Sequence, residues 1–182
     1  MKMLSIFILL ALTACSPVGS SSNTEAEPVA VHEIYLVRHA EKQLGNDPLL
    51  TPAGQTRAET LAEILSDKGL TQIHSTDYKR TLATAAPIAA RTGLEIELYD
   101  ASDLAAFADT LRATEGVHLV VGHSNTTPPL VQALGGDPGS DIDEASEYDR
   151  LYVVTIRPDT VSSRIDRYGV RYEREESGAT SQ

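Results

Sequence analysis

The sequence predicts an α/β protein, a three-layer sandwich with a mostly parallel central sheet flanked by helices. Short segments rich in β-branched residues alternate with longer segments of helical periodicity, and the connections between them are short. Helix-length crossovers join parallel strands and cover both faces of their sheet. Apolar residues make up 41% of the 182 residues and aromatic residues only 5%, so the core must consist largely of Leu, Ile, Val and Ala.

Six segments have the composition of strands. They are residues 33–38, 71–75, 94–98, 117–121, 151–157 and 161–167. The first ends in polar residues, as expected of a buried strand that delivers functional groups at its C-terminal end. The fourth is an apolar run before Gly122. The last two are joined by Pro158-Asp159-Thr160, so we expect an antiparallel hairpin at one edge of the sheet.

Four segments between these strands have helical signals. They are residues 51–69, 78–91, 100–114 and 126–134. The first has Thr51 as its N-cap and Pro52 at the first helical position. The second is rich in alanine, and Pro87 is expected to kink it. The third has apolar residues on one face, and the fourth ends at a Gly-Gly pair, which completes the order βαβαβαβαββ.

The N-terminus has the pattern of a processing signal. A positive start precedes an apolar run of about 12 residues, whereas a membrane-spanning helix needs roughly 20. The run ends in Leu12-Thr13-Ala14-Cys15, which resembles the bacterial lipobox, and Cys15 is the only cysteine. We therefore expect residues 1–14 to be a lipoprotein signal peptide that is removed, and Cys15 to be lipidated.

The rest of the chain is expected to divide into three parts. Residues 15–31 comprise the lipidated Cys and a flexible tether, because they contain few large apolar groups and no periodicity. Residues 32–172 form one domain, and residues 173–182 a disordered tail. The anchor predicts a location in the bacterial cell envelope. Ser16 after Cys15 resembles lipoproteins sorted to the outer membrane, facing the periplasm, if the source is Gram-negative.

Charge excludes one class of partner. The chain has 26 acidic and 15 basic residues, for a net charge of −11, whereas nucleic-acid binding relies on clustered Lys and Arg. A local basic pocket can still exist within an acidic surface. The segment 141–149, with five carboxylates, is interpreted as a solvated acidic loop. His32, His74 and His118 lie before or within strands and are interpreted as packing or surface residues.

Polar residues follow three of the predicted strands. Arg38 and His39 end the first strand, Arg80 comes shortly after the second, and His123 follows the fourth. Ligands of such sheets bind at the carboxyl ends of the strands. Two guanidinium groups can bind a phosphomonoester dianion, and an imidazole can attack phosphorus in line. The Arg charges disfavour protonation of His39 and stabilise the oxygens of the transferring group.

Four segments in this order resemble the histidine phosphatase superfamily, which includes the phosphoglycerate mutases, and especially its small single-domain bacterial branch. They are Leu36-Val37-Arg38-His39-Ala40-Glu41, Leu50-Thr51-Pro52-Ala53-Gly54, Ser75-Thr76-Asp77-Tyr78-Lys79-Arg80 with Thr84-Ala85, and Val121-Gly122-His123-Ser124. The resemblance covers residues 33 to about 157 and implies a phosphoglycerate mutase-like fold. It also implies that His39 takes the phosphoryl group and that Arg38, Arg80 and His123 bind it.

The proton donor to the leaving group stays open at this point. The resemblance implies a carboxylate whose position varies among branches of the superfamily. In the phytase-like branch it follows the second histidine, where this chain has Ser124. Asp100 and Glu41 are the candidates for the general acid, with Asp103 behind them. A good leaving group, such as that of phosphohistidine, would need little help from an acid.

These observations predict a phosphatase that hydrolyses a phosphomonoester or phosphoramidate through a phosphohistidine on His39, without metal or cofactor. We expect a monomer that acts on a phosphorylated small molecule or a phosphoprotein and contacts the membrane through Cys15. Three alternatives stay open. One is a metallohydrolase with His39, Glu41 and His123 as ligands. The others are a lipid-anchored phosphate- or phosphoprotein-binding module without turnover, and a phosphomutase.

Overall fold

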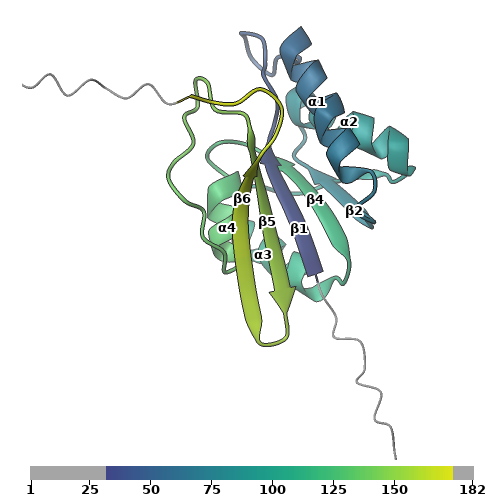
Figure 1. Cartoon of the computed structure of the whole chain (residues 1–182), viewed down its shortest axis with the longest axis vertical. Coiled ribbons are helices and arrows are strands. Elements are labelled where there is room, and N and C mark those ends of the chain that lie inside the picture. The colour runs from purple at the N-terminus through teal and green to yellow at the C-terminus, as the bar shows by residue number, and fades with distance from the viewer. Residues whose placement is uncertain (1–31, 174–182) are drawn as a thin grey trace, which may run out of the picture.

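The computed structural model describes residues 32–173 (Figure 1). The predicted signal peptide, the predicted lipidation site Cys15 with the predicted tether, and all but the first residue of the predicted tail lie outside the described residues. In the described part of the chain, no helix is both long and apolar enough to cross a membrane.

The elements follow the predicted order. The strands are β1 (His32–Arg38), β2 (Gln72–Ser75), β3 (Ile96–Leu98), β4 (Val117–Gly122), β5 (Arg150–Arg157) and β6 (Thr160–Arg167). The helices are α1 (Pro52–Leu65), α2 (Lys79–Thr92), α3 (Leu104–Ala113) and α4 (Thr127–Ala133). The largest differences from the predicted bounds are at α1, which ends at Leu65 rather than near Gly69, and at α3. Helix α3 begins after Asp103 because the side chain of Asp103 accepts a hydrogen bond from the N–H of Ala106 and caps the helix.

The strands form one sheet in the order β3-β2-β4-β1-β5-β6. Strands β3, β2, β4 and β1 are parallel to one another, whereas β5 pairs antiparallel with both β1 and β6. The predicted α/β class, with its terminal hairpin at the edge, is therefore confirmed. Arg38 pairs with Gly122 at the last position of the β1–β4 ladder, so the chain leaves both strands at the same edge of the sheet.

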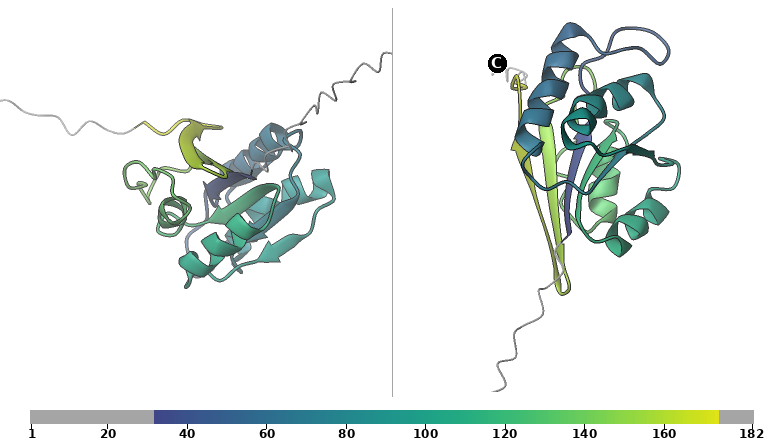
Figure 2. Two further views of the ribbon diagram at one scale, coloured as in Figure 1. Left: turned by 90° about the horizontal axis from the view of Figure 1, so that it is seen from below. Right: turned by 90° about the vertical axis from the view of Figure 1, so that its right-hand side faces the viewer.

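Helices cover both faces of the sheet (Figures 1 and 2). Because successive side chains of a strand point to opposite faces, β1 contributes to two cores. Tyr35 and Val37 pack with side chains of α1 and α2, while Ile34 and Leu36 pack with side chains of α3 and α4. The last five residues of β1 are buried, which makes this strand the centre of the three layers.

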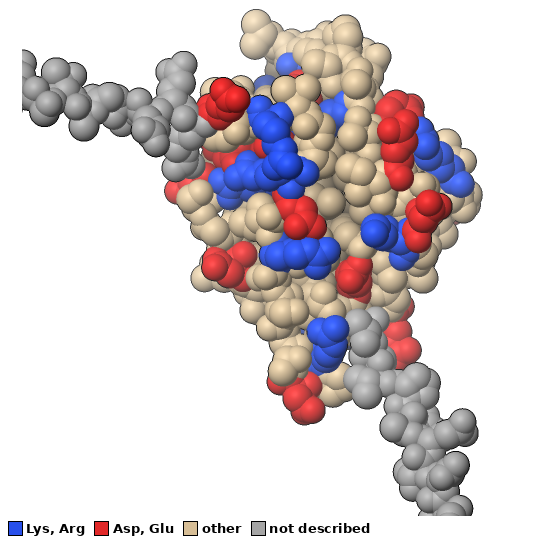
Figure 3. All heavy atoms as spheres, in the orientation of Figure 1, with Lys and Arg blue, Asp and Glu red and all other residues tan. Residues whose placement is uncertain are grey.

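The acidic segment at residues 141–149 differs from the solvated loop that we expected. Glu147 and Asp149 are each only 1% exposed. Arg150 Nε lies 2.6 Å from a Glu147 oxygen, and one nitrogen of Arg167 contacts both carboxylates at 2.8 and 2.6 Å. The expectation failed because these partners meet through strand pairing: Arg150 of β5 lies opposite Arg167 of β6. On the face of the molecule that Figure 3 shows, both acidic and basic side chains lie at the surface.

Candidate active site

The four predicted site residues lie at one edge of the sheet. Arg38 ends β1, His39 and His123 follow β1 and β4, and Arg80 is the second residue of α2, which follows β2. The N–H of His39 donates to the carbonyl of Gly122 at 2.9 Å. The rings of His39 and His123 meet edge to face, with centroids 5.4 Å apart. The fold thus brings together residues separated by up to 85 positions in the chain.

His39 is buried, and a hydrogen bond orients its ring. The Nδ1 atom lies 2.8 Å from the carbonyl oxygen of Ala40, which can only accept, so Nδ1 carries the proton and Nε2 keeps its lone pair. Burial lowers the pKa of His39 to about 3, and the charges of Arg38 and Arg80 act in the same direction. His39 is therefore neutral at physiological pH and has a free lone pair for nucleophilic attack.

Arg38 is held by the main chain of the 141–149 segment. Its Nη1 donates to the carbonyls of Asp143 and Glu147 at 3.3 and 3.0 Å, and its Nη2 donates to the carbonyl of Glu144 at 2.7 Å. The ring of Tyr148 stacks on the guanidinium, with 4.0 Å between Cζ and the ring centroid. Sequence reasoning missed this support, because backbone carbonyls have no signature in the sequence.

Arg80 and His123 share a second aromatic residue. The Arg80 guanidinium lies over the ring of Tyr78, 4.4 Å from its centroid, and the same ring meets the His123 ring at 5.0 Å. Burial lowers the pKa of His123 to about 4, and Arg80 and Arg38 contribute. The ring centroids of Tyr148 and His39 are 6.1 Å apart. Each arginine of the site therefore stacks on a tyrosine that also lies beside a histidine.

Three buried nitrogens of the site have no hydrogen-bond partner. They are Nε of Arg38, Nε of Arg80 and Nε2 of His123. In residues 32–173 only one other buried side-chain polar atom, the hydroxyl of Tyr168, lacks a partner. Buried polar groups almost always have partners, and an unpaired one costs about 1–3 kcal/mol. Guanidinium and imidazole nitrogens collected in this way suit an anion that has several acceptor oxygens.

Two motif residues hold the segment that follows His39. Thr84 of α2 accepts the N–H of Ala40 at 3.0 Å and donates to the carbonyl of Arg80 at 2.7 Å. Gly54 of α1 lies so close to the main chain of Glu41 that a Cβ there would be 2.2 Å from its carbonyl oxygen. These contacts give physical reasons for the Thr-Ala and Leu-Thr-x-x-Gly segments of the sequence.

The Glu41 carboxylate is bound to Arg57 of α1. Nε of Arg57 lies 3.0 Å from both carboxylate oxygens, and Nη2 lies 2.8 Å from one of them. The remaining donors of Arg57 bind the carbonyls of Tyr168 and Val170. Arg57 therefore links Glu41 to the C-terminal segment. The role of Glu41 as a general acid stays a prediction.

Asp100 and Asp103 lie in the turn between β3 and α3. The exposed Asp100 accepts the N–H of Ser102 at 2.8 Å, and this hydrogen bond lowers its pKa. Together with Tyr99 and His74 the two carboxylates line a hollow of about 330 Å³. Unlike Arg38 and Arg80, neither carboxylate contributes to the lowered pKa values of His39 and His123, and the roles of Asp100 and Asp103 as general acids stay predictions.

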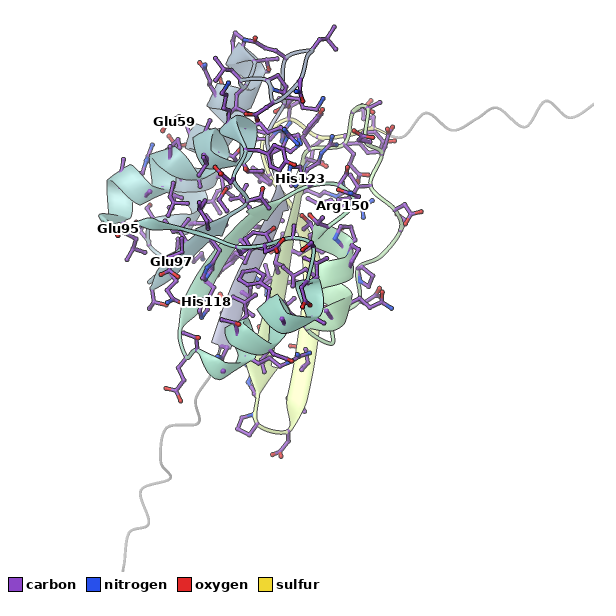
Figure 4. All side chains as sticks on the ribbon, turned by 180° about the vertical axis from the view of Figure 1, so that it is seen from behind. Glu59, Glu95, Glu97, His118, His123 and Arg150 are labelled. Atoms are coloured by element: carbon purple, nitrogen blue, oxygen red, sulfur yellow. The ribbon has the colours of Figure 1, made fainter. Side chains whose placement is uncertain are left out.

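The remaining histidines lie elsewhere. His32 begins β1, at the end of the strand away from the site. His74 and His118 are buried against each other, with 3.3 Å between Nε2 and Nδ1, and His74 packs on Phe107. Figure 4 shows His118 toward the opposite end of β4 from His123. Within residues 32–173 no group of three His, Cys, Asp or Glu side chains is arranged to hold a metal ion.

Sequence comparison matches residues 34–103 to the family described as the histidine phosphatase superfamily (branch 1). This segment contains Arg38, His39 and Arg80, while His123 lies beyond it. No curated protein matches the chain.

Solved structures share the fold at low sequence identity. A candidate α-ribazole-5′-P phosphatase from Escherichia coli has a TM-score of 0.62 at 14% identity, with 75% of this chain and 96% of that chain covered. A mycobacterial glucosyl-3-phosphoglycerate phosphatase has a TM-score of 0.59 at 16% identity, covering 76% and 98%. The protein histidine phosphatase SixA, complexed with tungstate, has a TM-score of 0.58 at 16% identity, covering 75% and 95%. At this level of identity, these structures show that the chain shares their phosphoglycerate mutase-like α/β fold.

Proposed function

We propose that this protein is a phosphatase that hydrolyses a phosphomonoester or a phosphoramidate through a phosphohistidine on His39. The observation that carries the proposal is the set of three unpartnered buried nitrogens, on Arg38, Arg80 and His123, around a neutral imidazole. The superfamily match and the phosphatases among the similar structures support the same reaction class.

The geometry supports a reaction in two steps. In the first, Nε2 of His39 forms a bond to phosphorus while the bond to the leaving oxygen or nitrogen breaks. The Nδ1–H···O=C bond to Ala40 keeps the ring in the productive tautomer, and Arg38, Arg80 and His123 donate to the phosphoryl oxygens. In the second, water attacks phosphorus, the P–N bond breaks, and inorganic phosphate leaves while His39 recovers its lone pair.

A covalent intermediate provides the test. Phosphoryl on nitrogen is acid-labile and base-stable, unlike phosphoserine, so rapid quench with a labelled aryl phosphate should trap such an adduct in the wild type. His39→Ala should abolish both the adduct and turnover. His32→Ala, at the other end of β1, is the matched control and should keep both. Near-normal turnover in His39→Ala would contradict the proposed mechanism.

The alternatives give different results in the same assays. A binding module would retain inorganic phosphate without releasing it from any ester. A metallohydrolase would lose activity in EDTA and recover it with zinc, whereas the proposed mechanism predicts unchanged turnover in the chelator. In the structure, Glu41, which that alternative needs as a ligand, has both carboxylate oxygens bound by Arg57.

We also propose that Cys15 anchors the domain in the bacterial cell envelope, on the basis of the lipobox. The described domain begins at His32, and β1 then runs for 7 residues before it reaches the site. At about 3.3 Å per residue, the site lies roughly 20 Å from this entry point. Cys15→Ser should release the protein from membranes, and membrane fractionation at high salt checks this. A variant that stays with the membrane would contradict the anchor.

A further inference from the structure

The guanidinium of Arg80 is held from two directions. Tyr78 lies against its face, as described above, and a carboxylate oxygen of Asp47 lies 3.6 Å from Nη1. Among residues 32–173, Asp47 is the one ion-pair partner of Arg80. Nε is left without a partner, and it is one of the three nitrogens assigned above to the phosphoryl group.

Asp47 also binds the start of the helix that carries Arg80. Tyr78 is the N-cap of α2, but its side chain makes no capping hydrogen bond. The carboxylate of Asp47 takes this place, since the oxygen that faces Arg80 accepts the N–H of Lys79 at 2.9 Å. One oxygen therefore contacts both the backbone of the first helical residue and the side chain of the second, which fixes the position of Arg80 relative to the helix.

The backbone of Asp47 adopts an uncommon conformation. It is the one non-glycine residue with positive φ, at 49°, in the part of the chain that the structure describes. Asp tolerates this left-handed region better than most residues, but the conformation still costs free energy and persists where the surrounding structure requires it. Here it accompanies a carboxylate that reaches from the 43–50 loop to a helix 32 positions later in the sequence.

We propose that Asp47 is a positioning residue that orients Arg80 for the transferring phosphoryl group. This inference rests on the proposed function, in which Arg80 binds that group. The contact of Asp47 with Nη1 restricts the position of the guanidinium, and stacking on Tyr78 restricts the orientation of its plane. Nε then stays free for a phosphoryl oxygen. Without the carboxylate, the long side chain of Arg80 would sample other rotamers and lose part of its stabilisation of the transition state.

Two substitutions separate this role from the capping role. Asp47→Asn removes the charge but keeps an oxygen that can accept the N–H of Lys79, whereas Asp47→Ala removes both. With 4-nitrophenyl phosphate, we expect Asn to lower kcat about tenfold, less than the loss of Arg80 itself, at an unchanged melting temperature. Ala should lower both kcat and the melting temperature. Asp77→Asn, which removes an exposed charge two residues before α2, is the matched control and should change neither.

A double-mutant cycle decides whether Asp47 acts through Arg80. In an Arg80→Ala background, Asp47→Asn should have no further effect on kcat. An equal loss in both backgrounds, or wild-type kcat in Asp47→Asn when Arg80→Ala is slow, would overturn the inference and leave the proposed function standing. Wild-type kcat in Arg80→Ala would overturn the inference together with the role of Arg80 in the proposed function.

Discussion

The two arginines of the site are supported in different ways. Arg38 donates to three backbone carbonyls of one segment and is 2% exposed. Arg80 lies on a helix and has one carboxylate, from Asp47, at 3.6 Å. Backbone carbonyls persist whatever side chains the segment carries, whereas a carboxylate is lost with a single substitution. We infer that the position of Arg38 is built into the fold, while the position of Arg80 depends on one side chain.

The largest expected effect comes from removing each arginine in turn. Arg38→Ala would leave three carbonyls without their donor, so we expect a loss of about 2–4 kcal/mol in the free energy of unfolding in addition to a loss of turnover. Arg80→Ala should slow kcat by about 10²- to 10³-fold with little change in stability, and His123→Ala should behave like it. Urea denaturation and steady-state kinetics measure the two quantities. Equal stability losses in both arginine variants would contradict the comparison.

A smaller effect on kcat, with a comparable loss of stability, should come from the ion pairs beneath the segment that holds Arg38. Glu147 accepts hydrogen bonds from Arg150 and Arg167, and removal of one partner of a buried pair costs about 3–5 kcal/mol. Part of this free energy is lost locally, because the 141–149 segment becomes less well ordered. Glu147→Gln should therefore displace Arg38 and lower kcat, while the contact of Asp47 with Arg80 stays intact. Thermal unfolding and kcat check the expectation, with Asp141→Asn as an exposed control on the same segment.

The same pair predicts a dependence of stability on pH. Burial raises the pKa of Glu147, but hydrogen bonds from Arg150, Asp143 and Arg167 lower it more, so the net shift is below the ordinary value of 4.5. A lowered carboxyl pKa gives stability that is present above the unfolded pKa and is lost as the pH falls through the folded one. The free energy of unfolding should therefore drop as the pH falls below about 4.5, and less steeply in Glu147→Gln.

His39 gives a second pH effect, which begins at a higher pH than that of Glu147. Its pKa is lowered to about 3 by burial, so the unfolded chain binds a proton there at pH values where the folded chain does not. This contribution to stability is complete above the ordinary histidine pKa of 6.5 and falls as the pH decreases from 6.5 towards 3. A series of urea titrations between pH 7 and 5 should show a shallower decline in His39→Gln than in the wild type. Parallel declines would show that His39 does not titrate in this way.

The smallest effects should distinguish the candidate general acids. If Asp100 or Glu41 protonates the leaving group, Asn or Gln there should slow hydrolysis of an alkyl phosphate more than that of an aryl phosphate. Asp103→Asn provides the comparison within the same turn. Equal changes for both substrates in every variant would indicate that none of these carboxylates supplies the proton, and that the natural leaving group departs without one.

Local patterns were sufficient to predict the elements and the four site residues that the fold brings together. Strand ends are visible in the sequence because apolar runs stop at polar residues or glycine, as they do at Arg38 and at Gly122-His123. Supports that depend on tertiary contacts were not visible. The carbonyls around Arg38 belong to residues 143–147, and Asp47 reaches Arg80 across 33 positions. The burial of Glu147 and Asp149 likewise depends on the register of β5 and β6.

The position of β1 has a consequence for the assembly of the protein. This strand comes first in the described chain, yet in the sheet it lies between β4 and β5, which are the fourth and fifth of the six strands to be synthesised. The edge that pairs with β4 stays unpaired until residue 122 has been made, and the edge that pairs with β5 until residue 157, and unpaired apolar strands are sites of aggregation. The hydrogen bonds that hold Arg38 also need the carbonyls of residues 143–147. A nascent or truncated chain that ends before these residues should therefore be both prone to aggregation and inactive. Competence for catalysis is therefore acquired late, with nearly the whole domain in place.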